Sequence, residues 1–210
     1  IAAGVAGAVG LASLYRALAV GQMGIVAPLS AVLTAGLPAL FGVLTEGMPG
    51  ALKLVGFGLA LVAIWLVAGT GASGGSRDGL GLAVLAGCGF GVFFILVHRA
   101  GANAVFWPLV AARVGSLGLV LPIALARRQL SRLDPRLLVL VVLSGSLDVA
   151  GNAFFVLAGQ AGRLDVAAIL ASLYPASTVL LAAMLLGERV MRVQVVGILA
   201  ALAAIALIAS

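Results

Sequence analysis

The stretch GLGLAVLAGCGFGVFFILVH, residues 79–98, decides the fold class, because it is long and apolar enough to cross a bilayer as a helix. It holds no charged residue before His98 and shows no alternation of polar and apolar positions. Lipid satisfies no exposed backbone N–H or C=O group, so we expect a helix here. Seven other runs are similar, and the eight approximate ranges are 2–20, 24–45, 51–69, 79–98, 104–126, 137–158, 164–186 and 190–209.

The composition of the whole chain excludes the soluble classes of protein. Of its 210 residues, 64% are hydrophobic and 9% are charged, and the mean hydropathy is +1.31. A soluble domain carries about 25% charged residues to cover its surface. The net charge of +6 comes from basic residues between the apolar runs, which favours contact with lipid headgroups over nucleic acid. The single cysteine, Cys88, leaves no internal disulfide and no cysteine-based metal site. We predict an all-α membrane protein, a polytopic bundle of about eight transmembrane helices with no cofactor.

Two parts of the chain resemble each other in the order of their helices and motifs. An aromatic segment, a glutamate after an apolar helix and a glycine in the next helix all recur after 139 to 142 residues. The pairs are Tyr15–Ala19 with Phe154–Ala158, Glu46 with Glu188, and Gly56 with Gly197. A true repeat would contain about five helices, and an odd number inverts the second unit in the membrane. Chance similarity between apolar helices is the alternative.

The repeat divides the chain at a stretch rich in glycine and serine, the linker 71–78. We expect residues 1–70 to be the last three helices of the first unit, and residues 79–210 to be all five helices of the second. On that count, two helices of the first unit would precede Ile1.

The motifs of both units resemble those of the drug/metabolite transporter superfamily, specifically its EamA-type permeases, which have ten helices. In the second unit the resemblance rests on Ser172–Ser177, on Leu185–Arg189, and on the spacing of Gln194 and Gly197. In the first unit it rests on Leu14–Ala19, whereas Thr45-Glu46-Gly47 replaces the usual Gly-Glu pair. The resemblance implies a multi-pass transporter of the plasma membrane, not an enzyme, that moves small organic metabolites or drugs. It does not identify the substrate.

Arg113 and Asp148 are ionisable residues that lie deep within predicted helices. They lie about 13 residues before the end of segment 104–126 and about 11 residues after the start of segment 137–158. Since one loop joins these antiparallel helices, the two side chains should lie at the same depth, within ~3 Å. We predict that they pair, because either charge alone would cost several kcal/mol in hydrocarbon. Two interpretations remain open: a static ion pair that fixes helix register, and a substrate or proton site.

Asp148, Asn152 and Phe155 follow a spacing of four and then three residues, so they share one helix face. A carboxylate, an amide and an aromatic ring that converge on a cavity would suit a small polar or zwitterionic solute. The alternative is a face that forms hydrogen bonds between helices.

Pro38 and Pro175 are expected to interrupt corresponding helices of the two units, because each removes an N–H donor and frees a carbonyl group. Paired interruptions of this kind point to the binding site of a transporter. Thr34 and Tyr174 supply hydroxyl groups beside them, and Tyr15 is either interfacial or directed into the cavity. Ordinary helix curvature is the alternative.

Three further features lie at helix ends or helix contacts. His98 and Arg99 end a predicted helix, which favours contact with headgroups over a proton relay. Glu46 indicates helix-end chemistry first and gating second. The Gly-x-x-x-Gly spacing of Gly87 and Gly91 allows close packing of helices or a homodimer.

These observations predict an integral membrane permease or exporter of a small organic molecule, working by alternating access between two inverted units. H⁺ is the expected coupling ion, with Asp148 as its carboxylate. A membrane enzyme is disfavoured because one histidine and six scattered acids offer no catalytic or metal-binding cluster. A non-transporting scaffold subunit, the other alternative, would have a sealed interior.

The two guides to membrane orientation disagree. The family resemblance implies cytoplasmic ends for the full chain and places the loop 127–136 outside the cell. Loops on that side carry seven Lys or Arg residues, however, against three on the opposite side. The rule that cytoplasmic loops are positive therefore favours the reverse orientation. Import and export are equally open.

Overall fold

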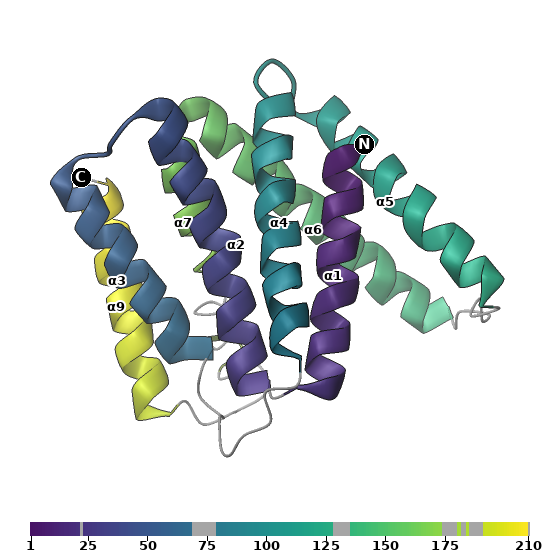
Figure 1. Cartoon of the computed structure of the whole chain (residues 1–210), viewed down its shortest axis with the longest axis horizontal. Helices are drawn as coiled ribbons and strands as arrows, with labels where there is room; N and C mark the ends of the chain where they lie inside the picture. The colour runs from purple at the N-terminus through teal and green to yellow at the C-terminus, as the bar shows by residue number, and fades with distance from the viewer. Residues whose placement is uncertain are drawn as a thin grey trace.

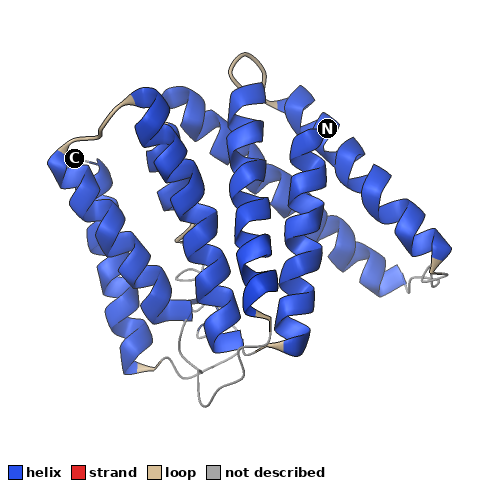
Figure 2. Cartoon of the chain, in the orientation of Figure 1, coloured by secondary structure: helices blue, strands red, loops and turns tan. Residues whose placement is uncertain are grey.

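The chain is helical in the part that the computed structural model describes, which is residues 1–21, 23–68, 79–127, 135–173, 180–181, 184 and 191–209. These residues form eight helices and no strand (Figure 1, Figure 2). The helices are α1 (Ala2–Val20), α2 (Met23–Glu46), α3 (Ala51–Ala68), α4 (Leu80–Ala100), α5 (Phe106–Ala126), α6 (Pro135–Ala161), α7 (Leu164–Ala171) and α9 (Arg192–Ala209). The all-α prediction is confirmed. The 71–78 linker lies outside the described residues.

Five of the described helices are long and apolar enough to cross a membrane: α1, α2 over Leu29–Glu46, α4, α5, and α6 over Leu137–Ala161. The apolar helices α3 and α9 are shorter. Large aliphatic and aromatic side chains remain exposed on the outside of the bundle. Such a surface suits lipid, because the helices satisfy their own backbone hydrogen bonds and present apolar side chains outward. The molecule is therefore a polytopic membrane bundle.

The apolar segment 164–186 is not one continuous helix in the described residues, because α7 ends at Ala171 and Leu180, Leu181 and Met184 are helical again further on. This agrees with the expected interruption near Pro175. In a continuous helix its ring would clash with the carbonyl group of Ala171, four residues earlier, and it has no N–H to bond there. Pro175 itself lies outside the described residues.

The structure corrects the predicted interruption at Pro38, because α2 runs without a break from Met23 to Glu46. Pro38 is fully buried. Membrane helices tolerate an internal proline when neighbouring helices and hydroxyl side chains compensate. The carbonyl group that Pro38 leaves without its helical donor is that of Thr34, one turn earlier, whereas the Thr34 hydroxyl donates a 2.8 Å hydrogen bond to the Ser30 carbonyl oxygen.

The central helix α4 packs between α1 and α2 (Figure 1). A Cβ added at Gly87 would lie 2.5 Å from Cβ of Leu33 on α2, and one at Gly89 would lie 2.8 Å from Cα of Gly10 on α1. Membrane helices depend on such small residues, because lipid supplies no hydrophobic force that drives helices together. Gly87 and Gly91 thus serve packing within the chain, and the homodimer stays a prediction.

The antiparallel pair α3 and α9 shows a reciprocal contact. A Cβ added at Gly56, near the start of α3, would lie 2.8 Å from Ile208, near the end of α9. A Cβ added at Gly197, near the start of α9, would lie 2.7 Å from Val67, near the end of α3. Gly197 and Ile208 each follow their counterparts, Gly56 and Val67, by 141 residues. Such an exchange of partners is what a two-fold axis perpendicular to both helices produces.

At the opposite side of the bundle, α5 and α6 slope away from the other helices (Figure 1). Every residue of α6 from Leu137 to Gly151 is exposed, whereas Phe155, Val156 and Gly159 are buried. Only the C-terminal part of α6 is therefore packed into the bundle.

Candidate functional site

A cavity of about 570 Å³ lies between α1, α4, α5 and α6. Its walls are mainly apolar, and its polar lining consists of Tyr15, Arg113, Ser116, Asp148 and Asn152. Cavities of this size and character suit small organic ligands. The structure thus brings together four of the residues that the sequence singled out: Tyr15, Arg113, Asp148 and Asn152.

Arg113 on α5 and Asp148 on α6 form an ion pair, in which Nη2 of Arg113 donates to Oδ2 of Asp148. The predicted pairing is confirmed. The two side chains remain 46% and 57% exposed, so the described protein does not seal them. Both lie far from the ends of apolar helices, where hydrocarbon would make exposed charges cost several kcal/mol. This argues that the pair faces water or a polar solute.

Local hydrogen bonds place two further polar groups beside the ion pair. The Ser116 hydroxyl donates to the carbonyl oxygen of Arg113 at 3.0 Å, and the Asn152 amide donates to the carbonyl oxygen of Asp148 at 2.9 Å. Each bond spans one helical turn, so the hydroxyl and the amide lie next to the charged residues along the same walls. The cavity therefore offers a cation, an anion, a hydroxyl and an amide in one region.

Aromatic side chains of α4 form the wall that the sequence reasoning missed: Phe90, Phe93 and Phe94. The Phe93 and Phe94 ring centroids are 5.4 Å apart in an edge arrangement, and those of Phe94 and Phe155 are 4.5 Å apart. Phe155 itself is buried in the core behind Phe94 and is not part of the lining. The sequence analysis expected Phe155 at the cavity beside Asp148. Phe155 follows Asp148 by seven residues, however, which places it ~10 Å further along α6.

A regular spacing on α1 could have revealed more of the lining. Gly4, Ala8, Leu11 and Tyr15 follow one another at intervals of three or four residues and all line the cavity. Such intervals place side chains on one helix face. Small residues on that face leave the space that the cavity occupies.

The remaining predicted residues lie elsewhere. Thr34 and Pro38 are buried within α2, and neither belongs to the cavity lining. Tyr174 and Pro175 lie outside the described residues. The paired-proline hypothesis therefore gains no support from the position of Pro38.

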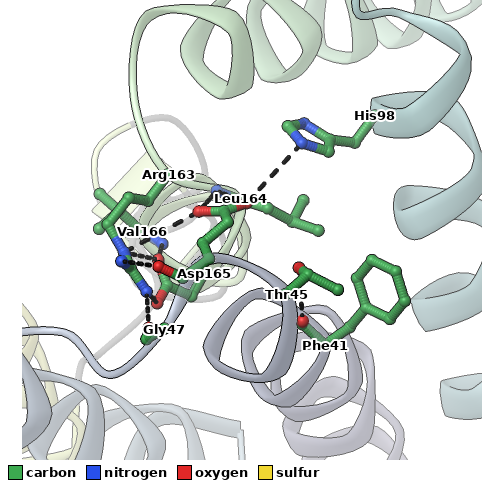
Figure 3. Close-up of polar contacts among 9 residues, drawn as sticks. Phe41, Thr45, Gly47, His98, Arg163, Leu164, Asp165 and Val166 are labelled. Carbon is green, nitrogen blue, oxygen red and sulfur yellow. Dashed lines mark hydrogen bonds and ion pairs between the residues drawn. The ribbon is translucent and has the colours of Figure 1, made fainter.

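A second polar group joins the C-terminal ends of α2 and α4 to the start of α7 (Figure 3). We name it the end cluster, and it consists of Glu46, His98, Arg163 and Asp165. Nη2 of Arg163 lies 2.7 Å from Oδ2 of Asp165, and its Nε lies 3.9 Å from Oε2 of Glu46. Nε2 of His98 lies 4.0 Å from Oε1 of Glu46. Asp165 is fully buried, and the Val166 N–H donates to its Oδ1 at 2.8 Å.

The end cluster also caps two helices. Gly47, which follows α2, has φ +85°, a left-handed backbone that favours glycine. Arg163 donates to the carbonyl oxygens of Glu46 at 3.2 Å and of Gly47 at 2.5 Å. In return, the Leu164 N–H donates to both carboxylate oxygens of Glu46 at 3.2 Å. The end of α2 thus receives a cation and the start of α7 an anion, as the helix dipoles favour.

The two basic residues at the end of α4 have different neighbours. Nε2 of His98 lies 4.0 Å from Oε1 of Glu46, whereas the Arg99 guanidinium lies 4.9 Å over the ring of Phe41. Their contact with headgroups stays a prediction. Arg163 lies between the apolar segments, and its hydrogen bond with Asp165 raises its pKa above the ordinary value. Its guanidinium therefore stays charged at any physiological pH.

The bundle and its cavity define a class of protein: a polytopic membrane protein with a cavity among its helices that charged and polar side chains help to line. The model of the EamA-like transporter family matches residues 77–210, which is more than half of the chain. The chain belongs to this family. It is a transporter of the drug/metabolite type and a multi-pass protein of the plasma membrane, and members of the family are transporters, not enzymes.

Comparison with solved structures supports the fold. One crystal structure superposes with a TM-score of 0.76 at 16% sequence identity, and the alignment covers 99% of this chain and 76% of the other. At this identity, the likeness concerns the fold alone. No curated protein matches the sequence significantly.

Proposed function

We propose that the protein moves a small organic solute through the cavity between α1, α4, α5 and α6 by alternating access. The observation that carries the proposal is the exposed Arg113–Asp148 pair on the cavity wall. A sealed interior would favour a scaffold subunit, whereas a lined hollow with charged groups favours a solute pathway.

The lining supports a substrate that has both polar and apolar parts. The charges of Arg113 and Asp148 can recognise groups of opposite charge, and the rings of Phe90, Phe93 and Phe94 can contact an apolar body. A small polar or zwitterionic solute with an apolar portion fits this distribution. Its binding would compete with the ion pair, so each charge exchanges its partner and neither is left alone.

We infer that alternating access uses two inverted units, as the repeat suggested. The reciprocal contacts of Gly56 with Ile208 and of Gly197 with Val67 support this proposal. The two-fold axis that relates these contacts is perpendicular to α3 and α9. In a bundle that spans the membrane, such an axis lies in the plane of the bilayer. Under the same relation, α1 and α6 are counterparts, and both line the cavity.

Asp148 is the proposed H⁺ carrier, because it is the one acidic residue among those that line the cavity. Protonation would release Arg113 to a substrate anion. We expect Asp148→Asn to abolish pH-dependent uptake in proteoliposomes, whereas Ser146→Ala, on the same helix but outside the lining, should keep it. Uptake by Asp148→Asn with unchanged pH dependence would remove Asp148 from the coupling mechanism.

A further inference from the structure

We propose that Glu46 and Arg163 form a latch that closes the cavity at the α2–α7 end, and that this end opens to solute when the latch is broken. The inference rests on the proposed transport function. It assigns a gating role to two residues that lie outside the cavity lining.

The latch lies further toward the ends of α4 and α6 than the residues of these helices that line the cavity. His98 follows the lining residue Phe94 by four residues on α4, a distance of ~6 Å along the helix. Gln160 follows the lining residue Asn152 by eight residues on α6, and its amide donates to the Gly101 carbonyl oxygen after α4. The end cluster and this bond therefore lie on the same side of the cavity.

Buried apolar side chains lie next to both the latch and the cavity. Val97, Phe155, Val156 and Leu164 belong to one core cluster, and the lining residue Phe94 and Phe41 of α2 pack against it. These side chains come from α2, α4, α6 and α7, so in this proposal they close the cavity toward the latch while those helices stay together. Contacts that hold the helix ends together consequently decide whether the passage is closed.

The hydrogen bonds between the ends of α2 and α7 are reciprocal. Arg163 donates to the last carbonyl groups of α2, and Glu46 accepts from the first N–H of α7. Separation of the two helices must break both halves at once. Charge-assisted bonds of this kind are stronger than neutral ones, which suits a contact that holds the closed state.

The same geometry makes the open state accessible. Arg163 keeps its bonds to Asp165 when Glu46 leaves, because both belong to the start of α7. Glu46 keeps His98 of α4 as a neighbour, 4.0 Å away. Neither the buried carboxylate of Asp165 nor the guanidinium is therefore left without a partner. The Glu46 and Arg163 side chains are themselves 28% and 27% exposed, so breaking their contact leaves no buried charge unpaired.

The test measures access to the cavity directly. Cys88→Ala removes the one native cysteine, and Ser116→Cys introduces a thiol in the cavity lining. A membrane-impermeant maleimide is applied to reconstituted vesicles from each side separately. We expect Arg163→Gln and Glu46→Gln each to raise the labelling rate from the α2–α7 side about fivefold or more, through a shift toward the open state. The double variant should resemble either single variant, because both break one latch.

Arg99→Gln is the matched control, since it removes a cation at the same end of the bundle but outside the latch. Unchanged labelling in Arg163→Gln and Glu46→Gln proteins that remain monodisperse would overturn the latch. An equal rise from both sides, or the same rise in Arg99→Gln, would also overturn it, because that result indicates general loosening. Side-specific opening without uptake of any solute would instead retain the latch and reject the transport function.

Discussion

The helices α1 and α6 differ sharply in how they are held, although both are apolar and both line the cavity. Small residues of α1, among them Ala3, Ala8 and Ala17, are buried against neighbouring helices. In α6, every residue from Leu137 to Gly151 is exposed, and large aliphatic side chains dominate that part. Hydropathy therefore does not determine which membrane helix is packed; the size of the residues on its faces does.

The Arg113–Asp148 ion pair helps to hold the exposed part of α6 in place, where packing contributes little. Over the exposed part of α6, Asp148 provides the hydrogen bond that ties α6 to α5. The rest of the anchoring comes from the buried C-terminal residues Phe155, Val156 and Gly159. α1 is thus held by backbone approach along its length. Among the described residues, α6 is held by the ion pair with Arg113, by the hydrogen bond from Gln160 to the Gly101 carbonyl oxygen, and by its packed C-terminal end.

The largest expected effect is the removal of one charge from the ion pair. Arg113→Leu leaves Asp148 without its partner in the middle of a membrane helix, where an isolated charge costs up to about 3 kcal/mol, and the half-exposed position of the pair lowers that cost. We expect a corresponding loss of stability in detergent unfolding experiments. The double variant Arg113→Leu/Asp148→Leu should recover most of it, because no charge is then left uncompensated. Equal losses in single and double variants would show that the pair does not tie α6 to α5.

A smaller effect is expected from added bulk on the packed helix. At Gly10 on α1, a Cβ would lie 3.1 Å from the backbone nitrogen of Phe90, whereas at Gly145 on α6 nothing lies within 4 Å. Gly10→Leu should therefore destabilise the protein by about 2 kcal/mol. Gly145→Leu is the matched substitution and should change stability by less than about 0.5 kcal/mol. Thermal unfolding of both variants in one detergent checks this, and a large loss in Gly145→Leu would mean that α6 is covered.

The smallest expected effects on stability come from truncating one aliphatic side chain at each end of α6. Val156 is 1% exposed and Leu140 is 62% exposed. Val156→Ala should cost about 1 kcal/mol through lost packing. Leu140→Ala should cost less than about 0.5 kcal/mol, since no protein contact is lost. If chemical denaturation shows the reverse order, the exposed part of α6 is a packed surface.

The sequence was sufficient for most helix boundaries, because the bilayer imposes a length and the connections are polar. The sequence was also sufficient to predict that Arg113 and Asp148 pair, because the rise per residue places both at the same depth on adjacent antiparallel helices. It failed at Pro38, where tertiary packing allows α2 to continue. Spacing along α6 also placed Phe155 with Asp148 and Asn152, whereas the structure buries it outside the cavity lining.

The end cluster could not have been found from sequence spacing. Its members Glu46, His98 and Arg163 are far apart in the chain and meet only because α2, α4 and α7 end or begin in one place. The sequence analysis did not identify the local pair Arg163 and Asp165, because the full burial of Asp165 depends on the packing of α7 against α2. Tertiary contacts of this kind leave no periodic signal.

The glycine contacts between α3 and α9 have a consequence for how such a chain can diverge. An exchange of equivalent partners is the arrangement that two identical half-length molecules would form without any covalent connection. Under the proposed repeat, each unit is free to acquire residues that the other lacks, while the shared glycines preserve the contact between α3 and α9. Arg163-Leu164-Asp165, which stand 141 positions after Gln22-Met23-Gly24 in the sequence, are one such asymmetry.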